Sequence, residues 1–198
     1  MTTHYIGPEP LTVEEVGRIV FSDTELALGD KARESVLRCR RYLDDRIAAA
    51  DKPIYGITTG FGSLCNVSIE SDSLRELQRN LVMSHACGSG DEVPSEIVRL
   101  MMFLKIQSLS YGCSGVRPET LDRLVDYYNA GVVPVVYQQG SLGASGDLAP
   151  LAHLTLPLLG LGEAYYKGER LTGEEICRRL NVEPIVLGAK GGLALLNG

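Results

Sequence analysis

The stretch GSLGASGDLAPLAHL, residues 140–154, joins a glycine-rich segment directly to an apolar one that is predicted to be helical. Three small residues, Ala144, Ser145 and Gly146, lie just before this helix. An ordinary tight turn would account for them, because glycine and serine are typical turn residues. A hydrolase nucleophile is disfavoured, since Gly143 and Gly146 do not flank the serine symmetrically as in the G-x-S-x-G elbow.

The same three residues also have the chemistry needed for cyclisation of the main chain. If the loop forces the Gly146 amide nitrogen against the Ala144 carbonyl, a ring can close with loss of water. Loss of the Ser145 hydroxyl then leaves an exocyclic methylidene. Glycine supplies an unhindered nitrogen and unusual backbone angles, serine a leaving hydroxyl, and alanine a small carbonyl donor. The product would be a potent electrophile.

The composition indicates a folded protein that acts on a small molecule or a protein partner. Of the 198 residues, 44% are hydrophobic and 22% are charged, which is enough apolar content for a core. The formal net charge is −6, and no basic run interleaved with aromatic residues is present. Nucleic acid is therefore not an expected partner.

The cysteines and the N-terminal sequence favour a reducing compartment. Five cysteines are an odd number, widely scattered and without a C-x-x-C pair, so neither a disulfide framework nor a metal site is indicated. Residues 1–16 show no basic region followed by an apolar stretch, and no apolar run approaches the roughly 20 residues that span a bilayer. We therefore expect a soluble, cytoplasmic protein without a membrane partner.

Helical periodicity recurs along most of the chain and predicts a mainly α fold. Residues 55–69 interrupt it as a long glycine-rich loop, and a small hairpin turning at Lys167-Gly168 precedes a short final helix. One predicted helical face carries Leu74, Leu77, Leu81 and His85. The predicted helices cover residues 12–20, 30–50, 71–88 (with Ser71 as N-cap), 94–111, 118–130 and 148–161.

Two of these helices, residues 94–111 and 148–161, are apolar on nearly all sides. Burial of such surfaces requires neighbours on every side, which this chain is not expected to supply in full. Because buried apolar surface contributes roughly 25 cal/mol per Å², we expect the isolated chain to self-associate.

Residues 140–154 closely resemble the signature of the aromatic amino acid ammonia-lyases, in which an Ala-Ser-Gly tripeptide becomes a methylidene-imidazolone group. The resemblance continues in YGITTGFG, NLVMSHACGSG, YGCSGVRPE and the closing GGLALLNG, and covers nearly all residues after about position 50. It implies that Ala144, Ser145 and Gly146 form this cofactor autocatalytically.

The pair Ser84-His85 resembles the form found in family members that act on histidine, whereas enzymes for phenylalanine or tyrosine typically carry pairs such as Phe-Leu or His-Leu. The implied reaction converts L-histidine to trans-urocanate and ammonia, with His85 as a polar contact for the imidazole. A histidine satisfied within the core is the alternative. Thr58 stands where enzymes for histidine more often have Asn, so a tyrosine or phenylalanine lyase or an aminomutase stays open.

Further site residues follow from the resemblance. Tyr55 matches a tyrosine of a mobile inner loop with a proton-transfer role, although a tyrosine packed on the surface would look the same. Gly62 and Leu142 match positions close to the substrate. Asn197 matches an asparagine that hydrogen-bonds the imidazolone. Asp147 is expected to cap the helix beginning near Leu148, whose N-terminal dipole would favour electron withdrawal, or to serve as a cap alone.

The resemblance also implies the architecture: a loop-rich N-terminal region packed on helices that lead into a long-helix bundle. Family members are homotetramers, are more than twice as long, and carry later Tyr, Arg, Phe and Glu positions that bind the carboxylate and assist the chemistry. We therefore expect residues 1–198 to be the N-terminal part of a truncated lyase whose C-terminal helical portion is absent. A folded module without activity of its own is the alternative.

Overall fold

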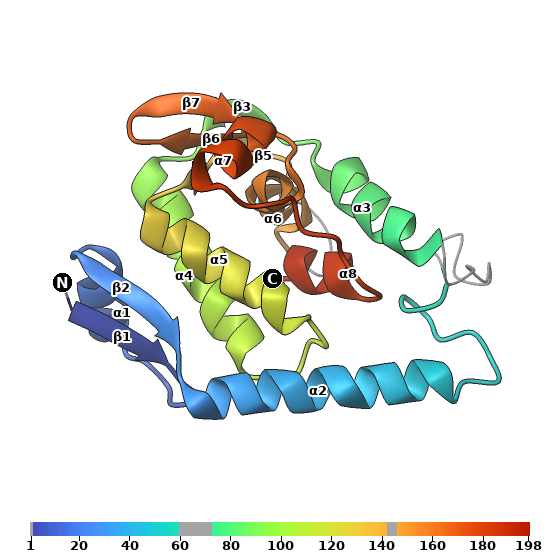
Figure 1. Ribbon diagram of the computed structural model, residues 1–198. Helices are drawn as coiled ribbons and strands as arrows, with labels where there is room; N and C mark the ends of the chain where they lie inside the picture. The colour runs from blue at the N-terminus through green and yellow to red at the C-terminus, as the bar shows by residue number, and fades with distance from the viewer. Residues whose placement is uncertain (1, 60–72, 142–145) are drawn as a thin grey trace.

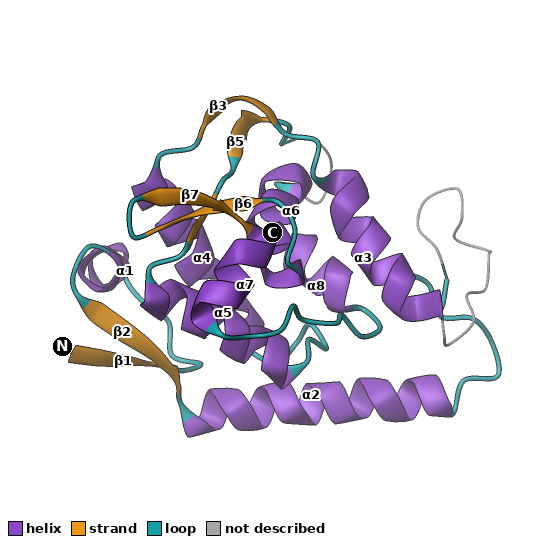
Figure 2. Ribbon diagram, turned by 45° about the horizontal axis from the view of Figure 1, so that its top comes forward, coloured by secondary structure: helices purple, strands orange, loops and turns teal. Residues whose placement is uncertain are grey.

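Helices form the body of the molecule in the computed structural model, which describes residues 2–59, 73–141 and 146–198. The longest helix, α2 (Asp30–Ala48), runs along one side of the molecule and packs against α4 and α5 (Figure 1). The strands are short and pair into small sheets away from the helical centre (Figure 2). The mainly α fold predicted from the sequence is confirmed. Predictions for Ser71 and for the loop beyond Thr59 lie outside the described residues.

The N-terminal region adds a parallel strand pair that the sequence pattern did not reveal. Strand β1 (Thr2–Ile6) pairs with β2 (Thr24–Leu28), and α1 (Val13–Val20) connects them. The start of α1 follows from a capping box: Thr12 Oγ1 accepts a hydrogen bond from the Glu15 amide at 3.2 Å, and the Thr12 amide donates to Glu15 Oε2 at 2.8 Å. The predicted helix at residues 12–20 is thus confirmed.

The core lies between α4 (Ser95–Ser110) and α5 (Pro118–Ala130), which pack on each other. The expectation that α4 lacks neighbours is largely wrong, because α1, α2, α5 and β4 of the same chain cover it. Its exposed apolar side chains include Ile97 and Leu104, which are 43% and 48% exposed. Fully buried large side chains from the two helices include Met102, Phe103, Ile106, Leu109, Leu121, Leu124, Tyr127 and Tyr128.

A second helical group carries parts of the motifs quoted from the sequence. Its members, α3 (Leu74–His85), α6 (Leu148–Thr155) and α8 (Gly191–Leu196), pack against one another. The predicted helix at residues 148–161 is shorter than expected. Pro157 has no amide hydrogen for the next helical bond, and the chain continues as a 3-10 turn, η3 (Leu156–Leu159).

The remaining strands form two small sheets beside these helices. Strand β3 (Ser89–Glu92) pairs antiparallel with β5 (Tyr137–Gln139), and β4 (Val133–Pro134) lies beside the β6–β7 hairpin. The hairpin, β6 (Glu163–Tyr166) and β7 (Glu169–Thr172), turns at Lys167 and Gly168, both with positive φ. Helix α7 (Gly173–Leu180) follows, so this predicted hairpin and short helix are confirmed.

Over the described residues, the helices are too short or too polar to cross a bilayer.

Candidate active site

The C-terminal end of α8 lies against the loop that carries the predicted tripeptide. A side chain at Gly198 would place its Cβ 3.8 Å from both the Gly146 carbonyl oxygen and Asp147 Cβ, and 3.6 Å from Leu151 Cδ1. Asn197, the residue before, is exposed. The fold therefore brings the closing LLNG segment next to the last residue of the Ala-Ser-Gly tripeptide.

Gly146 has unusual backbone angles, as the sequence argument expected. Its φ is +63°, in the left-handed region that favours glycine, and an added Cβ would meet no heavy atom of the described residues within 4 Å. The left-handed conformation by itself favours glycine at this position. Ala144 and Ser145, with Leu142 and Gly143, lie outside the described residues.

The expected capping role of Asp147 is wrong in its mechanism. Asp147 does hold the position before α6, and its carbonyl accepts the first helical bond from the Leu151 amide at 3.0 Å. Its backbone, however, is left-handed, with φ of 49°, and its side chain caps no amide. The carboxylate instead accepts a hydrogen bond from the Ser141 hydroxyl. This bond ties together the two ends of the loop that contains the tripeptide.

A buried lysine that the sequence reasoning missed lies beside these residues. Lys105 is only 5% exposed, and its ammonium group donates a hydrogen bond to the Asn197 carbonyl. Burial lowers the pKa of Lys105 to about 8. Its signal in the sequence was a lysine inside the apolar stretch MMFLKIQSL, where an unpaired charge would be costly.

Two adjoining pockets give this region room for a small molecule. One, of about 290 Å³, is lined by Asp147, Leu151, Asn197, Gly198 and residues of α4. The other, of about 350 Å³, lies on the α8 side. Lys105 and Asn197 line both pockets. The larger depression, about 640 Å³ beside α7, contains none of the predicted site residues.

The predicted substrate-binding pair Ser84 and His85 lies at the C-terminal end of α3. His85 Nδ1 donates to the Leu81 carbonyl at 2.8 Å, and Ser84 Oγ donates to the same carbonyl at 3.0 Å. With the proton on Nδ1, His85 Nε2 carries a lone pair, and no described residue donates a hydrogen bond to it. His85 is half-buried.

Helix α3 is fixed to α8 by a hydrogen bond and close packing at Gly192. Gln78, fully buried on α3, accepts a hydrogen bond from the Gly192 amide at 2.8 Å. A Cβ at Gly192 would lie 2.8 Å from the Gln78 carbonyl oxygen, closer than real contacts allow. The helix that carries Ser84 and His85 is therefore anchored to the helix that ends at Asn197.

Tyr55 lies in a turn between α2 and α3. The turn is held by the Thr58 amide donating to the Ile54 carbonyl at 2.9 Å, and by the Ile54 amide donating to Thr58 Oγ1 at 2.8 Å. Tyr55 is 63% exposed. This segment lies near the C-terminal end of α2 and the N-terminal end of α3 (Figure 1). Gly62 lies outside the described residues.

A metal centre is not indicated in the part of the chain that the structure describes, where no three His, Cys, Asp or Glu side chains gather as ligands.

A known protein family matches nearly the whole chain. The aromatic amino acid lyase family matches residues 11–198, which includes every element from α1 to α8. The chain belongs to the aromatic amino acid lyase family. The histidine ammonia-lyase of Clostridium tetani is 50% identical over 188 residues, which are 95% of this chain and 36% of that relative.

Solved structures of aromatic amino acid lyase relatives share the fold. Histidine ammonia-lyase from Trypanosoma cruzi superposes with a TM-score of 0.87 at 34% identity, over 100% of this chain and 38% of that one. Phenylalanine aminomutase from Pantoea agglomerans gives a TM-score of 0.90 at 30% identity, with the same coverage. The chain thus spans somewhat over a third of the length of these relatives.

Proposed function

We propose that residues 1–198 form the N-terminal part of a histidine ammonia-lyase, which converts L-histidine to trans-urocanate and ammonia. The observation that carries this proposal is the approach of Gly198 to Gly146 and Asp147, with Asn197 and Asp147 lining one pocket, which brings together two lyase motifs far apart in the sequence. The 50% identity to the Clostridium tetani histidine ammonia-lyase supports the choice of substrate.

The residues around the tripeptide suit a methylidene-imidazolone group formed from Ala144, Ser145 and Gly146. Gly146 has a left-handed conformation with no other described residue crowding its Cα, and the bond between Ser141 and Asp147 holds the loop ends together. When formed, this group supplies an electrophile that makes the amino group of the substrate a better leaving group.

Positive potential at this site has two sources in the chain. The eight-residue helix α6 begins at Leu148, just after Gly146, and in the proposal its N-terminal amides and dipole act on the tripeptide. Lys105 adds a cation beside Asn197 and fixes its main chain. In the proposal, the Asn197 side-chain amide hydrogen-bonds the imidazolone oxygen, with Leu142 and Gly143 packed close by. Both sources would increase electron withdrawal from the ring.

Substrate recognition and proton transfer fall to α3 and to the turn after α2. His85 offers Nε2 as an acceptor for the imidazole N–H of the substrate, because its Nδ1 proton is already engaged by the Leu81 carbonyl. Ser84, Gly62 and Leu142 complete the proposed substrate-binding set. The Tyr55 oxygen takes the β-proton, which requires its exposed turn to close over the substrate.

The assembly and setting follow the same proposal. We place the enzyme in the cytoplasm, in histidine catabolism, as a homotetramer whose active sites draw residues from several subunits. Its partner is the amino acid substrate rather than nucleic acid or a membrane.

A second function from the same family is favoured by two observations. The chain superposes on a phenylalanine aminomutase, and Thr58 is the residue more typical of enzymes for phenylalanine or tyrosine. In the structure, Thr58 supports the turn that carries Tyr55. A tyrosine or phenylalanine ammonia-lyase, or an aminomutase, would use the same tripeptide on another substrate.

Product analysis distinguishes these functions. The full-length enzyme that contains this sequence is incubated separately with L-histidine, L-phenylalanine and L-tyrosine, and the products are identified by chromatography and mass spectrometry. The proposal predicts urocanate and ammonia from histidine as the dominant reaction. Cinnamate or coumarate, or a β-amino acid, as the dominant product would instead support the second function.

A further inference from the structure

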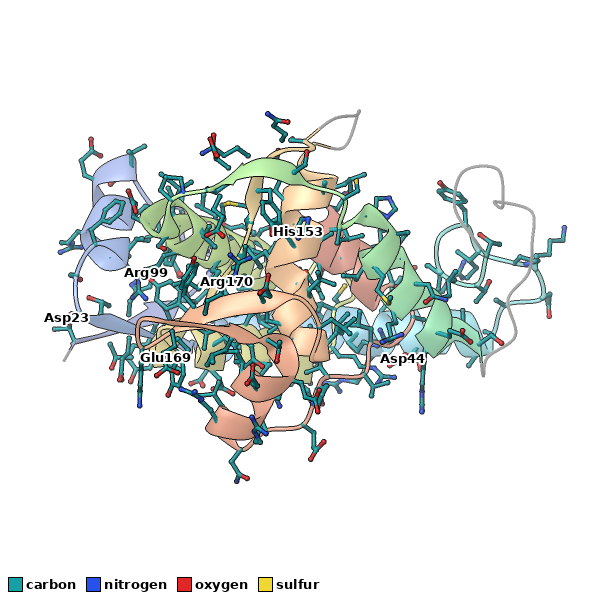
Figure 3. All side chains as sticks on the ribbon, turned by 90° about the horizontal axis from the view of Figure 1, so that it is seen from above. Asp23, Asp44, Arg99, His153, Glu169 and Arg170 are labelled. Atoms are coloured by element: carbon teal, nitrogen blue, oxygen red, sulfur yellow. The ribbon has the colours of Figure 1, made fainter. Side chains whose placement is uncertain are left out.

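We infer that His153 is a positioning residue: it holds the segment after α3, which directly follows Ser84 and His85, against helix α6, which begins just after the tripeptide. The catalytic consequence of this role rests on the proposed function. His153 lies on α6, facing the segment that joins α3 to β3 (Figure 3). Its Nε2 accepts a hydrogen bond from the Gly88 amide at 3.0 Å. Gly88 follows His85 by three residues, so this bond joins the two halves of the proposed site.

The backbone at Gly88 is closely packed against its neighbours. A Cβ at Gly88 would lie 3.0 Å from both Cδ2 and Nε2 of His153, and 3.3 Å from the Gln139 carbonyl oxygen. A Cβ at Gly140 would lie 3.0 Å from Gly88 Cα and 3.2 Å from Ala149 Cβ. Helix α6, the end of β5 and the segment after α3 therefore converge at one point. Gly140 leads directly into the tripeptide loop, so the same point also fixes the start of that loop.

The hydrogen bond from the Gly88 amide sets the tautomer of the His153 ring. A backbone amide can only donate, so Nε2 must carry the lone pair and the proton must reside on Nδ1. Burial lowers the pKa of His153, which favours this neutral form. The Tyr137 ring meets the imidazole edge-on, with centroids 5.1 Å apart, and fixes its plane from the β5 side.

Two substitutions distinguish the effect of the hydrogen-bond acceptor of His153 from the effect of its volume. In His153→Gln, Oε1 can take the place of Nε2 and accept from the Gly88 amide, whereas His153→Leu fills a similar space without an acceptor. Thr155→Val is the matched control. It removes a buried hydrogen bond to the Leu151 carbonyl within the same helix, but does not touch the segment after α3.

Hydrogen exchange tests the contact without depending on catalysis. Peptides covering residues 86–90 are followed by mass spectrometry in the full-length enzyme. We expect exchange in His153→Leu to be roughly tenfold faster than in the wild type, and exchange in His153→Gln and Thr155→Val to match it. Equal exchange in His153→Leu and the wild type would overturn the inference.

Steady-state kinetics on L-histidine test the consequence. His153→Leu should raise KM roughly tenfold, with a smaller effect on kcat, because loss of the bond to Gly88 lets the end of α3 with Ser84 and His85 shift, while the residues of the tripeptide are unchanged. His153→Gln should restore the wild-type KM. An unchanged KM, or failure of glutamine to rescue it, would contradict the positioning role. Absence of urocanate formation by the wild type would overturn the proposed function, while the exchange result would still decide whether His153 holds the segment.

Discussion

The imidazole of His85 is oriented by its own helix, through the bond from Nδ1 to the Leu81 carbonyl. If Nε2 recognises the substrate, His85→Leu in the full-length enzyme should lower kcat/KM for histidine by about a hundredfold or more. The values for tyrosine and phenylalanine should change little, because neither substrate needs that acceptor. The measurement is kcat/KM for the three amino acids. His4→Leu, a histidine replaced on β1, serves as the control.

A parallel fall for all three substrates in His85→Leu would mean that His85 is only structural.

Lys105 makes the stability of the protein depend on pH in a direction opposite to that of a paired lysine. Burial lowers its pKa from 10.5 to about 8, so between these values the unfolded state binds more protons. Stability from this group therefore rises with pH, by about 2 kcal/mol between roughly pH 7.5 and pH 9.5. Below the folded pKa the rise disappears, because both states are charged.

Urea denaturation of the wild type and of Lys105→Met, each at about pH 7.5 and about pH 9.5, measures the contribution of Lys105 to the free energy of unfolding. The pKa values of Tyr127 and Tyr128 are also raised by burial, but both proteins share these tyrosines, so their effect cancels in the difference. Lys31→Met, at a lysine side chain 79% exposed, should behave as the wild type. Identical pH profiles for the wild type and Lys105→Met would refute the assignment.

Local chemistry explains which site residues could be predicted. The cyclisation argument expected unusual backbone angles at Gly146, and its φ is +63°. Asp147 does occupy the N-cap position of α6, but its side chain caps no amide, because the backbone is left-handed and the carboxylate turns toward Ser141. Neither that bond nor the bond from Lys105 to Asn197 has a recognisable sequence pattern. The first depends on how the chain turns between Ser141 and Asp147, and the second on how two distant segments meet.

At the scale of elements, the junction of α3 and α8 depends on a glycine. Gly192→Ala would place a Cβ 2.8 Å from a backbone oxygen of Gln78, which cannot move aside as a flexible side chain would. We expect this substitution to lower the free energy of unfolding by about 1–3 kcal/mol. Gly191→Ala is the matched control, because its Cβ would meet Leu187 no closer than 3.4 Å.

Urea unfolding of the two alanine variants provides the measurement. Equal stabilities of Gly192→Ala and Gly191→Ala would show that the close approach of α3 and α8 is not required.

Helices were predictable because their apolar periodicity and caps are local, as at Thr12 and in the proline-initiated α5. Most strands were missed because they are two to five residues long and pair with distant partners, as β3 does with β5. Only the hairpin at Lys167-Gly168 carried its own turn signal. The end of α6 was misplaced because its apolar pattern continues through Pro157 into η3.

At the scale of the whole molecule, the chain covers most of its own apolar helices but leaves several large apolar side chains exposed. Met83 and Leu104 are 44% and 48% exposed. We therefore expect the 198-residue chain to fold but to self-associate, and to be silent toward L-histidine, since it spans 36% of the Clostridium tetani relative. Light scattering and a urocanate assay on the purified chain check this. A stable monomer, or urocanate formation, would contradict it.

The central claim is that residues 144–146 become the electrophile of a lyase, and peptide mass spectrometry tests it most directly. The full-length enzyme and Ser145→Ala are digested, and the peptide containing residues 144–146 is weighed in each. Ring closure and loss of the Ser145 hydroxyl each release one water. The account predicts that the wild-type peptide is lighter than its sequence by two water molecules. It predicts that the Ser145→Ala peptide lacks the methylidene and that the Ser145→Ala enzyme has no turnover. A wild-type peptide of unmodified mass from an active enzyme would contradict it.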